Sequence, residues 1–326
     1  MGKYRTFIII CGLFFFNVCK AQQEVLYSQY FFSQLAINPA YAGNDDNLNF
    51  TGLSKKQWLG IDGSPTTFSF IGHSPLFHKP STINNYSGTG IKQGRGFSDN
   101  NQVGLGLVLC NDHEGVDNTF ISSFAYSYKI LFNEVTRLSF GLQASILNFR
   151  QSFNQIDNLN TLDPVFQDNV SVTKFNVGSG VFYETVHYYV GLSVPEIIEN
   201  KLTPKNASGE SQLRQYFLTG GYVFYLSRLF KFKPTLLLRY TESMPAQFDL
   251  SANFLYRDKI WAGISYRYNN SVNIIGELLI SQKLRLGIAY DYPLSKIHLV
   301  TNGSAEIMIS YTFQKVKHRI INPRYF

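Results

Sequence analysis

Strict alternation of apolar and polar residues constrains the fold of this chain more than any other feature. Residues 247–257 contain one apolar parity, which reads Phe248, Leu250, Ala252, Phe254 and Tyr256. The pattern returns in residues 259–269, 284–292 and 307–313. Because successive side chains of a strand point to opposite faces, this period predicts strands with one apolar and one polar face.

The polar face of the predicted strands carries charges of both signs. They are Arg239, Asp249, Arg257, Arg267, Glu277, Arg285, Asp291 and Glu306. The dry core of a soluble β-sandwich could not hold so many unpaired charges, and the strands are nearly long enough to cross a membrane at a tilt. Such charges line a water-filled pore or pair across the lumen, and their mixed signs favour pairing. The fold class we expect is all-β, a transmembrane antiparallel β-barrel of about fourteen strands.

A mean hydropathy of −0.09 agrees with this fold, because a wall that alternates lipid-facing and lumen-facing residues averages near zero. We expect strands at 47–57, 66–75, 103–112, 118–131, 136–148, 173–183, 187–195, 212–226, 232–242, 246–257, 259–269, 271–281, 283–292 and 304–314. The even count predicts that both termini are periplasmic, with short periplasmic turns and long external loops. The connection 76–102 breaks this rule, as a functional insertion or a miscounted strand.

The N-terminus has the pattern of a secretory signal. Lys3 and Arg5 precede an apolar run at 7–16, and we expect cleavage after Ala21. A membrane anchor and a lipoprotein acylated at Cys19 are the alternatives. The predicted domains are therefore a signal peptide at 1–21, an N-terminal extension or plug at 22–46, an outer-membrane barrel at 47–314 and a basic periplasmic tail at 315–326.

The extension at 22–46 does not alternate like a wall strand. Leu26, Tyr30, Ser33 and Ile37 follow helical spacing, and Asn38-Pro39 is expected to end that helix. Two interpretations stay open: a short segment folded into the barrel as a plug, or a lead-in packed on the periplasmic rim.

The excess positive charge is concentrated at the C-terminus. Removal of the signal leaves 26 basic and 22 acidic residues, a net charge of +4. Residues 314–326 alone supply +4, from Lys315, Lys317, Arg319 and Arg324. A nucleic-acid-binding protein would carry such charge on a face of its fold, so we expect no nucleic-acid partner and interpret the tail as a docking segment.

No pattern of catalytic, metal-binding or cofactor-binding residues is evident. The sequence lacks a P-loop, a dinucleotide fingerprint, GxSxG and HExxH, and its six histidines show no paired ligand spacing. Asn111-Asp112-His113-Glu114-Gly115 has the composition of a turn. We therefore expect no enzyme activity, no metal and no cofactor.

Several motifs occur in one order along the chain. They are Ser28-Gln29-Tyr30, Asn38-Pro39-Ala40-Tyr41-Ala42-Gly43, Gln57-Trp58, Ile61-Asp62-Gly63-Ser64-Pro65, Asn111-Asp112 with Gly115, Asp163-Pro164 with Phe166, and the ending Asn322-Pro323-Arg324-Tyr325-Phe326. Together they resemble the PorP/SprF family of type IX secretion system outer-membrane proteins of Bacteroidetes. Lys55-Lys56 departs from the resemblance, which leads us to expect an arginine there.

The resemblance implies a multi-pass protein of the cell outer membrane without enzyme activity. Its partners would be outer-membrane lipid, the periplasmic ring and motor proteins of the secretion system, and a secreted adhesin of the kind used in gliding motility. The motif residues and the basic tail are then candidates for partner contact. The alternative is an outer-membrane channel for small solutes, because the Asn-Pro-Ala stretch is also similar to the plugs of fatty-acid channels.

Overall fold

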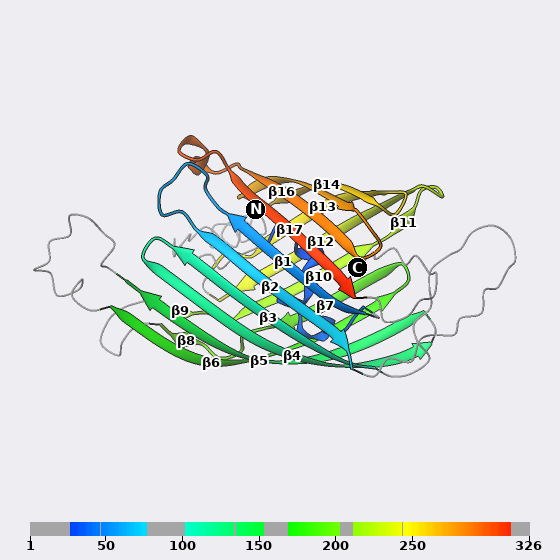
Figure 1. Ribbon diagram of the computed structural model, residues 1–326, viewed down its shortest axis with the longest axis horizontal. Coiled ribbons are helices and arrows are strands. Elements are labelled where there is room, and N and C mark those ends of the chain that lie inside the picture. The colour runs from blue at the N-terminus through cyan, green and yellow to red at the C-terminus, as the bar shows by residue number, and fades with distance from the viewer. Residues whose placement is uncertain are drawn as a thin grey trace, which may run out of the picture.

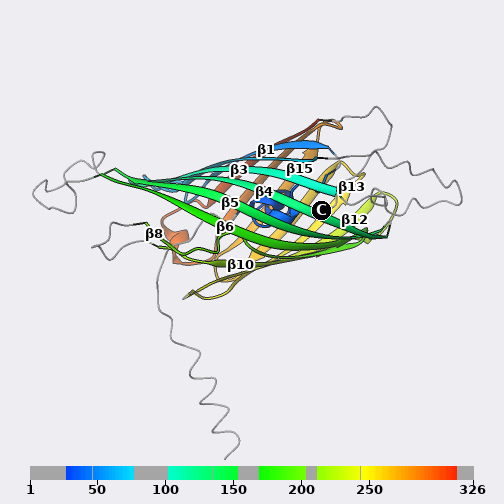
Figure 2. The same cartoon turned by 90° about the horizontal axis from the view of Figure 1, so that it is seen from below.

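The computed structural model describes residues 27–45, 47–76, 102–133, 135–152, 169–202, 211–242 and 244–313. Fourteen long strands form a closed antiparallel barrel (Figures 1 and 2). The first seven are β1 (Leu48–Lys56), β2 (Thr66–Pro75), β3 (Gln102–Glu114), β4 (Asp117–Asn133), β5 (Thr136–Gln151), β6 (Val170–Thr185) and β7 (Tyr188–Val194). The other seven are β10 (Gln215–Tyr222), β12 (Phe230–Thr241), β13 (Gln247–Tyr256), β14 (Ile260–Arg267), β15 (Ser271–Leu279), β16 (Leu284–Pro293) and β17 (Ser304–Phe313).

The barrel closes because its first and last strands pair with each other. Each strand pairs with the next along the chain, and β1 pairs antiparallel with β17. A short pair, β8 (Asn200–Lys201) and β9 (Ser211–Gln212), lies outside the main sheet, and β11 (Phe224–Tyr225) continues the line of β10. The predicted fold class is confirmed, and each predicted strand corresponds to one long strand of the wall.

The predicted strand at 212–226 is interrupted, for a physical reason. Strands β10 and β11 pair with β12 in one continuous register, and in this register Tyr222 falls opposite Pro234. Proline has no N–H group to donate, so the ladder loses a hydrogen bond at this point. The amide of Val223 instead donates to the His187 carbonyl oxygen, at 2.7 Å.

The two faces of the wall are chemically opposite. The outer face exposes large apolar side chains such as Leu142 (64%), Ile274 (63%) and Ile288 (64%). The inner face is lined by buried serine, threonine, asparagine and charged residues. An outer apolar band around a polar interior is the pattern of a barrel that is surrounded by lipid. Among the described residues, no helix has the length and apolar character needed to cross a membrane.

The two ends of the barrel differ in their connections. We call the end where β1 begins and β17 ends the base, and the opposite end the far end. The connections at 134–135, 186–187, 257–259 and 280–283 are short and all lie at the base, whereas the far end has the short connections 115–116 and 268–270 beside longer ones such as 57–65 and 294–303. Arg257 belongs to one of these turns, with a φ of 52°, so the expectation that it faces the lumen is wrong. The long connection after Leu76 falls mostly outside the described residues.

The segment 27–45 lies inside the barrel and runs from its far half to its base (Figure 1). It forms three short 3-10 turns, η2 (Tyr30–Phe32), η3 (Gln34–Ala36) and η4 (Pro39–Tyr41). Separate 3-10 turns replace the helix that the spacing predicted: η3 ends at Ala36, before Asn38-Pro39, but Pro39 then begins η4 and the Asn38 side chain caps it. Proline suits a first helical position, where its missing N–H costs nothing.

The apolar core of the molecule therefore sits inside the barrel, between this segment and the wall. Tyr27, Leu35, Ala40 and Ala42 pack with Leu53, Ile71, Val108 and Phe182, and Tyr30, Phe31 and Ile37 pack with Phe217, Leu237 and Ile275. Aromatic rings bury large apolar areas, so these contacts favour the inserted position of the segment.

Candidate functional site: the occupied lumen

The N-terminal segment is fixed in the far half of the lumen by a charged cluster. Lys55 Nζ lies 2.9 Å from Asp291 Oδ2 and 3.6 Å from Glu306 Oε2. The Ser28 hydroxyl donates to Asp291 at 2.6 Å, and the Ser28 amide donates to Glu306 Oε2 at 2.8 Å. The Gln29 amide donates to the other Glu306 oxygen at 3.1 Å. We call Ser28, Lys55, Asp291 and Glu306 the far anchor.

The charged groups of the far anchor are buried, so each of them must be paired. Lys55 is 2% exposed and Glu306 is 1% exposed, so two carboxylates and one ammonium are held away from bulk water. Such groups persist only when each is paired and hydrogen-bonded, because their desolvation costs several kcal/mol per ion. The backbone and hydroxyl of Ser28 supply hydrogen bonds that the single lysine cannot.

A second anchor lies at mid-height and is centred on Asn38. Its side-chain amide donates to the carbonyl oxygens of Val181 (3.1 Å) and Leu192 (3.3 Å), and its oxygen accepts from the Ala40 amide at 2.9 Å. Strand β6 can approach η4 closely because the residue of β6 that faces this turn is Gly180, which has no side chain. A Cβ at Gly180 would lie 2.1 Å from Asn38 Oδ1.

A third anchor closes the segment at the base. Arg137 and Glu184 form an ion pair on β5 and β6, and both bond to Asn44. Asn44 Oδ1 accepts from Arg137 at 2.6 Å, and Asn44 Nδ2 donates to Glu184 at 3.0 Å. The preceding Gly43 has a φ of 61° and could not carry a Cβ, which would fall 2.6 Å from Gly104 Cα.

Aromatic residues fill the space between the anchors. The Tyr30 hydroxyl bonds to Thr235 Oγ1 at 2.9 Å. Tyr27 bonds to Ser69, and Tyr41 packs edge-on against the Phe182 ring. These contacts explain why the segment is rich in aromatic residues.

The luminal charges pair, as their mixed signs indicated. Arg267 Nε donates to Asp249 Oδ2 at 2.9 Å between neighbouring strands, and Arg285 Nε lies 2.9 Å from Glu277 Oε1. Sequence reasoning missed Lys55, Arg137, Glu184 and Lys233 as luminal residues. The alternation could have identified them as luminal, because each occupies the same parity as the inward-facing side chains of its strand.

The candidate residues of the sequence divide into two groups. Ser28, Gln29, Tyr30, Asn38, Pro39, Tyr41 and Gly43 lie together in the lumen. The others that the structure describes lie at the far end: Gln57, Trp58, Asp62, Gly63 and Pro65 in or beside the β1–β2 connection, and Asn111 and Asp112 near the end of β3. The Gly115 amide donates to the Gly63 carbonyl at 2.8 Å, which joins two of these connections.

Asn111 and Asp112 belong to a strand rather than to a turn. Asn111 pairs with Phe120 and Asp112 with Thr119, and only Gly115 and Val116 separate β3 from β4. Asp112 Oδ1 accepts from the Thr67 hydroxyl at 2.6 Å. Asp163, Pro164, Lys315, Lys317, Arg319, Pro323, Arg324 and Phe326 lie outside the described residues, as do the predicted signal peptide and the basic tail.

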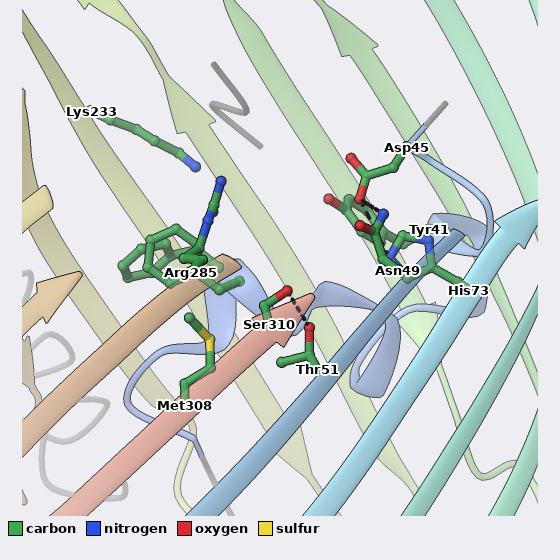
Figure 3. A pocket seen from close by; sticks show the side chains of 11 residues that line it. Tyr41, Asp45, Asn49, Thr51, His73, Lys233, Arg285, Met308 and Ser310 are labelled. Atoms are coloured by element: carbon green, nitrogen blue, oxygen red, sulfur yellow. Dashed lines mark hydrogen bonds and ion pairs between the residues drawn. The ribbon is translucent and has the colours of Figure 1, made fainter. Parts of the chain in front are cut away.

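A small cavity of about 30 Å³ remains in the base half of the lumen, beside the N-terminal segment (Figure 3). It is lined by Phe31, Phe32, Tyr41, Asp45, Asn49, Thr51, His73, Lys233, Arg285, Met308 and Ser310. In the described part of the chain, no three His, Cys, Asp or Glu residues are grouped so that they could hold a metal ion.

This architecture defines a class: an outer-membrane β-barrel whose lumen is occupied by its own N-terminal segment. The family model of the type IX secretion system membrane protein PorP/SprF matches residues 19–311. The chain therefore belongs to the PorP/SprF family of type IX secretion system membrane proteins. A search of curated proteins finds no match.

Solved barrel structures are only distantly similar to the chain. The CymD monoaromatic hydrocarbon channel is 11% identical, with a TM-score of 0.48 over 89% of this chain and 94% of that one. A FadL homologue of Pseudomonas aeruginosa is 10% identical, with a TM-score of 0.43 over 85% and 93%. OmpF of Salmonella typhi is 11% identical, with a TM-score of 0.36 over 83% and 99%.

Proposed function

We propose that the protein is a non-enzymatic platform of the type IX secretion system. It links periplasmic ring or motor proteins to the outer membrane, or it anchors a secreted adhesin at the cell surface. The observation that carries this proposal is the occupied lumen: residues 27–45 run from the far half to the base and are anchored at three levels. A lumen filled in this way suits a protein that works through its two ends.

In this proposal the base faces the periplasm. Four of its connections are short turns, as in outer-membrane barrels with short periplasmic connections, and Phe313 ends the last strand there. Residues 314–326, with four basic side chains and no acidic one, would then dock on an acidic partner surface. The sequence also predicts a periplasmic N-terminus, but the residues before Tyr27 lie outside the described part of the chain, and Tyr27 itself lies in the far half. We therefore propose a periplasmic location for the C-terminus alone.

Crosslinking of a tagged copy in intact cells, followed by mass spectrometry of purified outer membranes, tests the proposal. Recovery of periplasmic ring or motor proteins would support a link to the machinery. Recovery of one large secreted protein would support an adhesin anchor. Recovery of lipid and barrel-assembly factors alone would refute both roles.

The tail is tested by two variants of different kind. One variant ends at Phe313, and the other keeps full length but replaces Lys315, Lys317, Arg319 and Arg324 with glutamine. Both should lose the crosslinked periplasmic partner while the barrel remains folded. Normal partner recovery by the glutamine variant would show that the charge of the tail has no part in docking.

A solute channel is the second candidate, and the cavity in the base half is the observation that favours it. Conductance in planar bilayers separates the two functions. The platform proposal expects little ion flow through the intact protein, whereas a channel would conduct without removal of residues 27–45.

A further inference from the structure

Three turns lie next to one another at the base of the barrel, on the right-hand side of Figure 1. They join β11 to β12, β13 to β14 and β15 to β16, at 226–229, 257–259 and 280–283. The Arg257 amide donates to the Leu229 carbonyl at 2.8 Å, and the Leu279 amide donates to the Lys259 carbonyl at 2.8 Å. These backbone bonds connect each turn to the next, so the side chains of all three share one stretch of the base.

The exposed charges of these turns are all positive. We call the four exposed cations the basic rim: Arg228, Arg257, Lys259 and Lys283. Asp258 is the single acidic residue of the three turns, and its carboxylate is paired with Lys231 of β12. Within the residues that the structure describes, no carboxylate forms an ion pair with a member of the basic rim. The rim therefore presents four positive charges to the surroundings of the barrel.

The apolar outer face of the wall continues into the same turns. Leu226, Leu229 and Ile280 are exposed residues of the turns themselves. On the strands beside them, the ring centres of Phe230 and Tyr256 are 4.8 Å apart on the outer face. Aromatic rings at the end of an apolar band mark the boundary between lipid and water, and cations beyond the band extend toward the headgroups. We therefore expect the basic rim to lie at the level of the lipid headgroups.

Arg257 shows how a side chain of the rim is directed. Its guanidinium carbon lies 5.1 Å from the centre of the Tyr256 ring, which has the outward parity of β13. The charge is therefore held toward the outer face and away from the lumen. Arg257 has a φ of 52° and Asp258 a φ of 55°, and such tight turns favour glycine or asparagine. The turn thus carries a cation where its backbone alone would favour a smaller residue.

We propose that the basic rim binds the phosphate headgroups of anionic phospholipids, whose acyl chains lie against the apolar band beside the turns. Phosphate oxygens accept charge-assisted hydrogen bonds from arginine and lysine. Clusters of such residues at a membrane surface are attracted to lipids with a net negative charge. A zwitterionic lipid offers no net charge to neutralise four cations, so the rim selects anionic lipid. This inference goes beyond the platform function, and its test involves no secretion partner.

Three water-soluble probes separate the headgroup charge from the acyl chains. Dihexanoyl phosphatidylglycerol carries a net negative charge, dihexanoyl phosphatidylcholine has the same chains without net charge, and glycerol phosphate is an anion without chains. Native mass spectrometry of the purified full-length protein in detergent measures the Kd of each probe. The phosphatidylglycerol should bind at least tenfold more tightly than either of the others. Added salt should reduce this preference, because exposed charges are screened.

A variant in which glutamine replaces all four cations of the basic rim should lose the preference for phosphatidylglycerol. The matched control has the same net charge, because glutamine replaces four cations of the far end, namely Arg150, Lys174, Lys201 and Lys296. The control should keep the preference. Heat-dependent gel mobility verifies that both variants are folded. Should the rim variant not fold, two double variants, Arg228→Gln with Lys283→Gln and Arg257→Gln with Lys259→Gln, divide the test.

Three outcomes would overturn the proposal. Equal affinity for the two lipids would show that the rim does not select anionic lipid, and would leave an acidic protein surface as its partner. A preference that persists in the folded rim variant, or that both variants lose equally, would show that the rim is not the binding site. Equal binding of glycerol phosphate and phosphatidylglycerol would assign the rim to a free phosphate anion.

Discussion

At the scale of single residues, Lys55 has the clearest energetic role. It neutralises Asp291 and Glu306 in the lumen, at 2.9 and 3.6 Å. Lys55→Met would remove the cation that directly contacts these two buried carboxylates. Removal of one partner from a buried pair costs roughly 3–5 kcal/mol. We expect a lower urea midpoint for unfolding of the purified barrel, measured by tryptophan fluorescence.

The adjacent Lys56 provides the control for that prediction. Its ammonium is only half-buried and donates to the Ser64 carbonyl at 2.9 Å and to the Thr66 hydroxyl at 2.8 Å. No carboxylate depends on these bonds and the half-exposed ammonium also reaches water, so Lys56→Met should cost less than Lys55→Met, about 1 kcal/mol. Equal losses in the two variants would show that the far anchor does not stabilise the barrel.

At the scale of elements, the N-terminal segment depends on glycine in the wall. A side chain at Gly180 would occupy the place of Asn38 Oδ1, so Gly180→Val should push η4 out of position. Cys110 reports the change, because its sulfur lies 3.6 Å from the Tyr27 hydroxyl on the luminal side. Labelling of Cys110 by a small maleimide should be several times faster in the variant.

Gly52→Ala is the matched change for this experiment. A Cβ at Gly52 has no other atom within 4 Å, so the substitution should leave the labelling rate of Cys110 unchanged. Slow labelling in both variants would mean that the segment stays in place without the close approach at Gly180.

The same element shows where sequence reasoning succeeds and where it fails. Alternation is local, so the wall strands could be predicted from residues such as 247–256 alone. The packing of residues 27–45 depends on partners more than a hundred positions away, such as Val181 for Asn38 and Glu306 for Ser28. Local spacing indicated a helix there and could not distinguish a plug from a lead-in. The partners of Lys55 on β16 and β17 could not be read from local spacing either, although its parity along β1 already indicated an inward side chain.

At the scale of the whole molecule, the segment and the wall form one closed body. Removal of residues 22–45 should raise single-channel conductance in planar bilayers, because it takes away the described segment that fills the lumen. The exposed luminal charges of both signs would hydrate and admit small ions. Far-UV circular dichroism checks that the truncated barrel is folded. Unchanged conductance in folded truncated protein would show that another part of the chain closes the lumen.

The far anchor also sets an order of assembly. Ser28 bonds to Glu306, 278 positions later in the chain, so this contact forms only when the last strand arrives. Contacts so distant in sequence form late, because the intervening chain must be ordered first. The seam between β1 and β17 and the contacts of Ser28 are therefore completed together. A barrel that closed before its N-terminal segment entered would have to reopen, so closure of the wall also reports that the interior is filled.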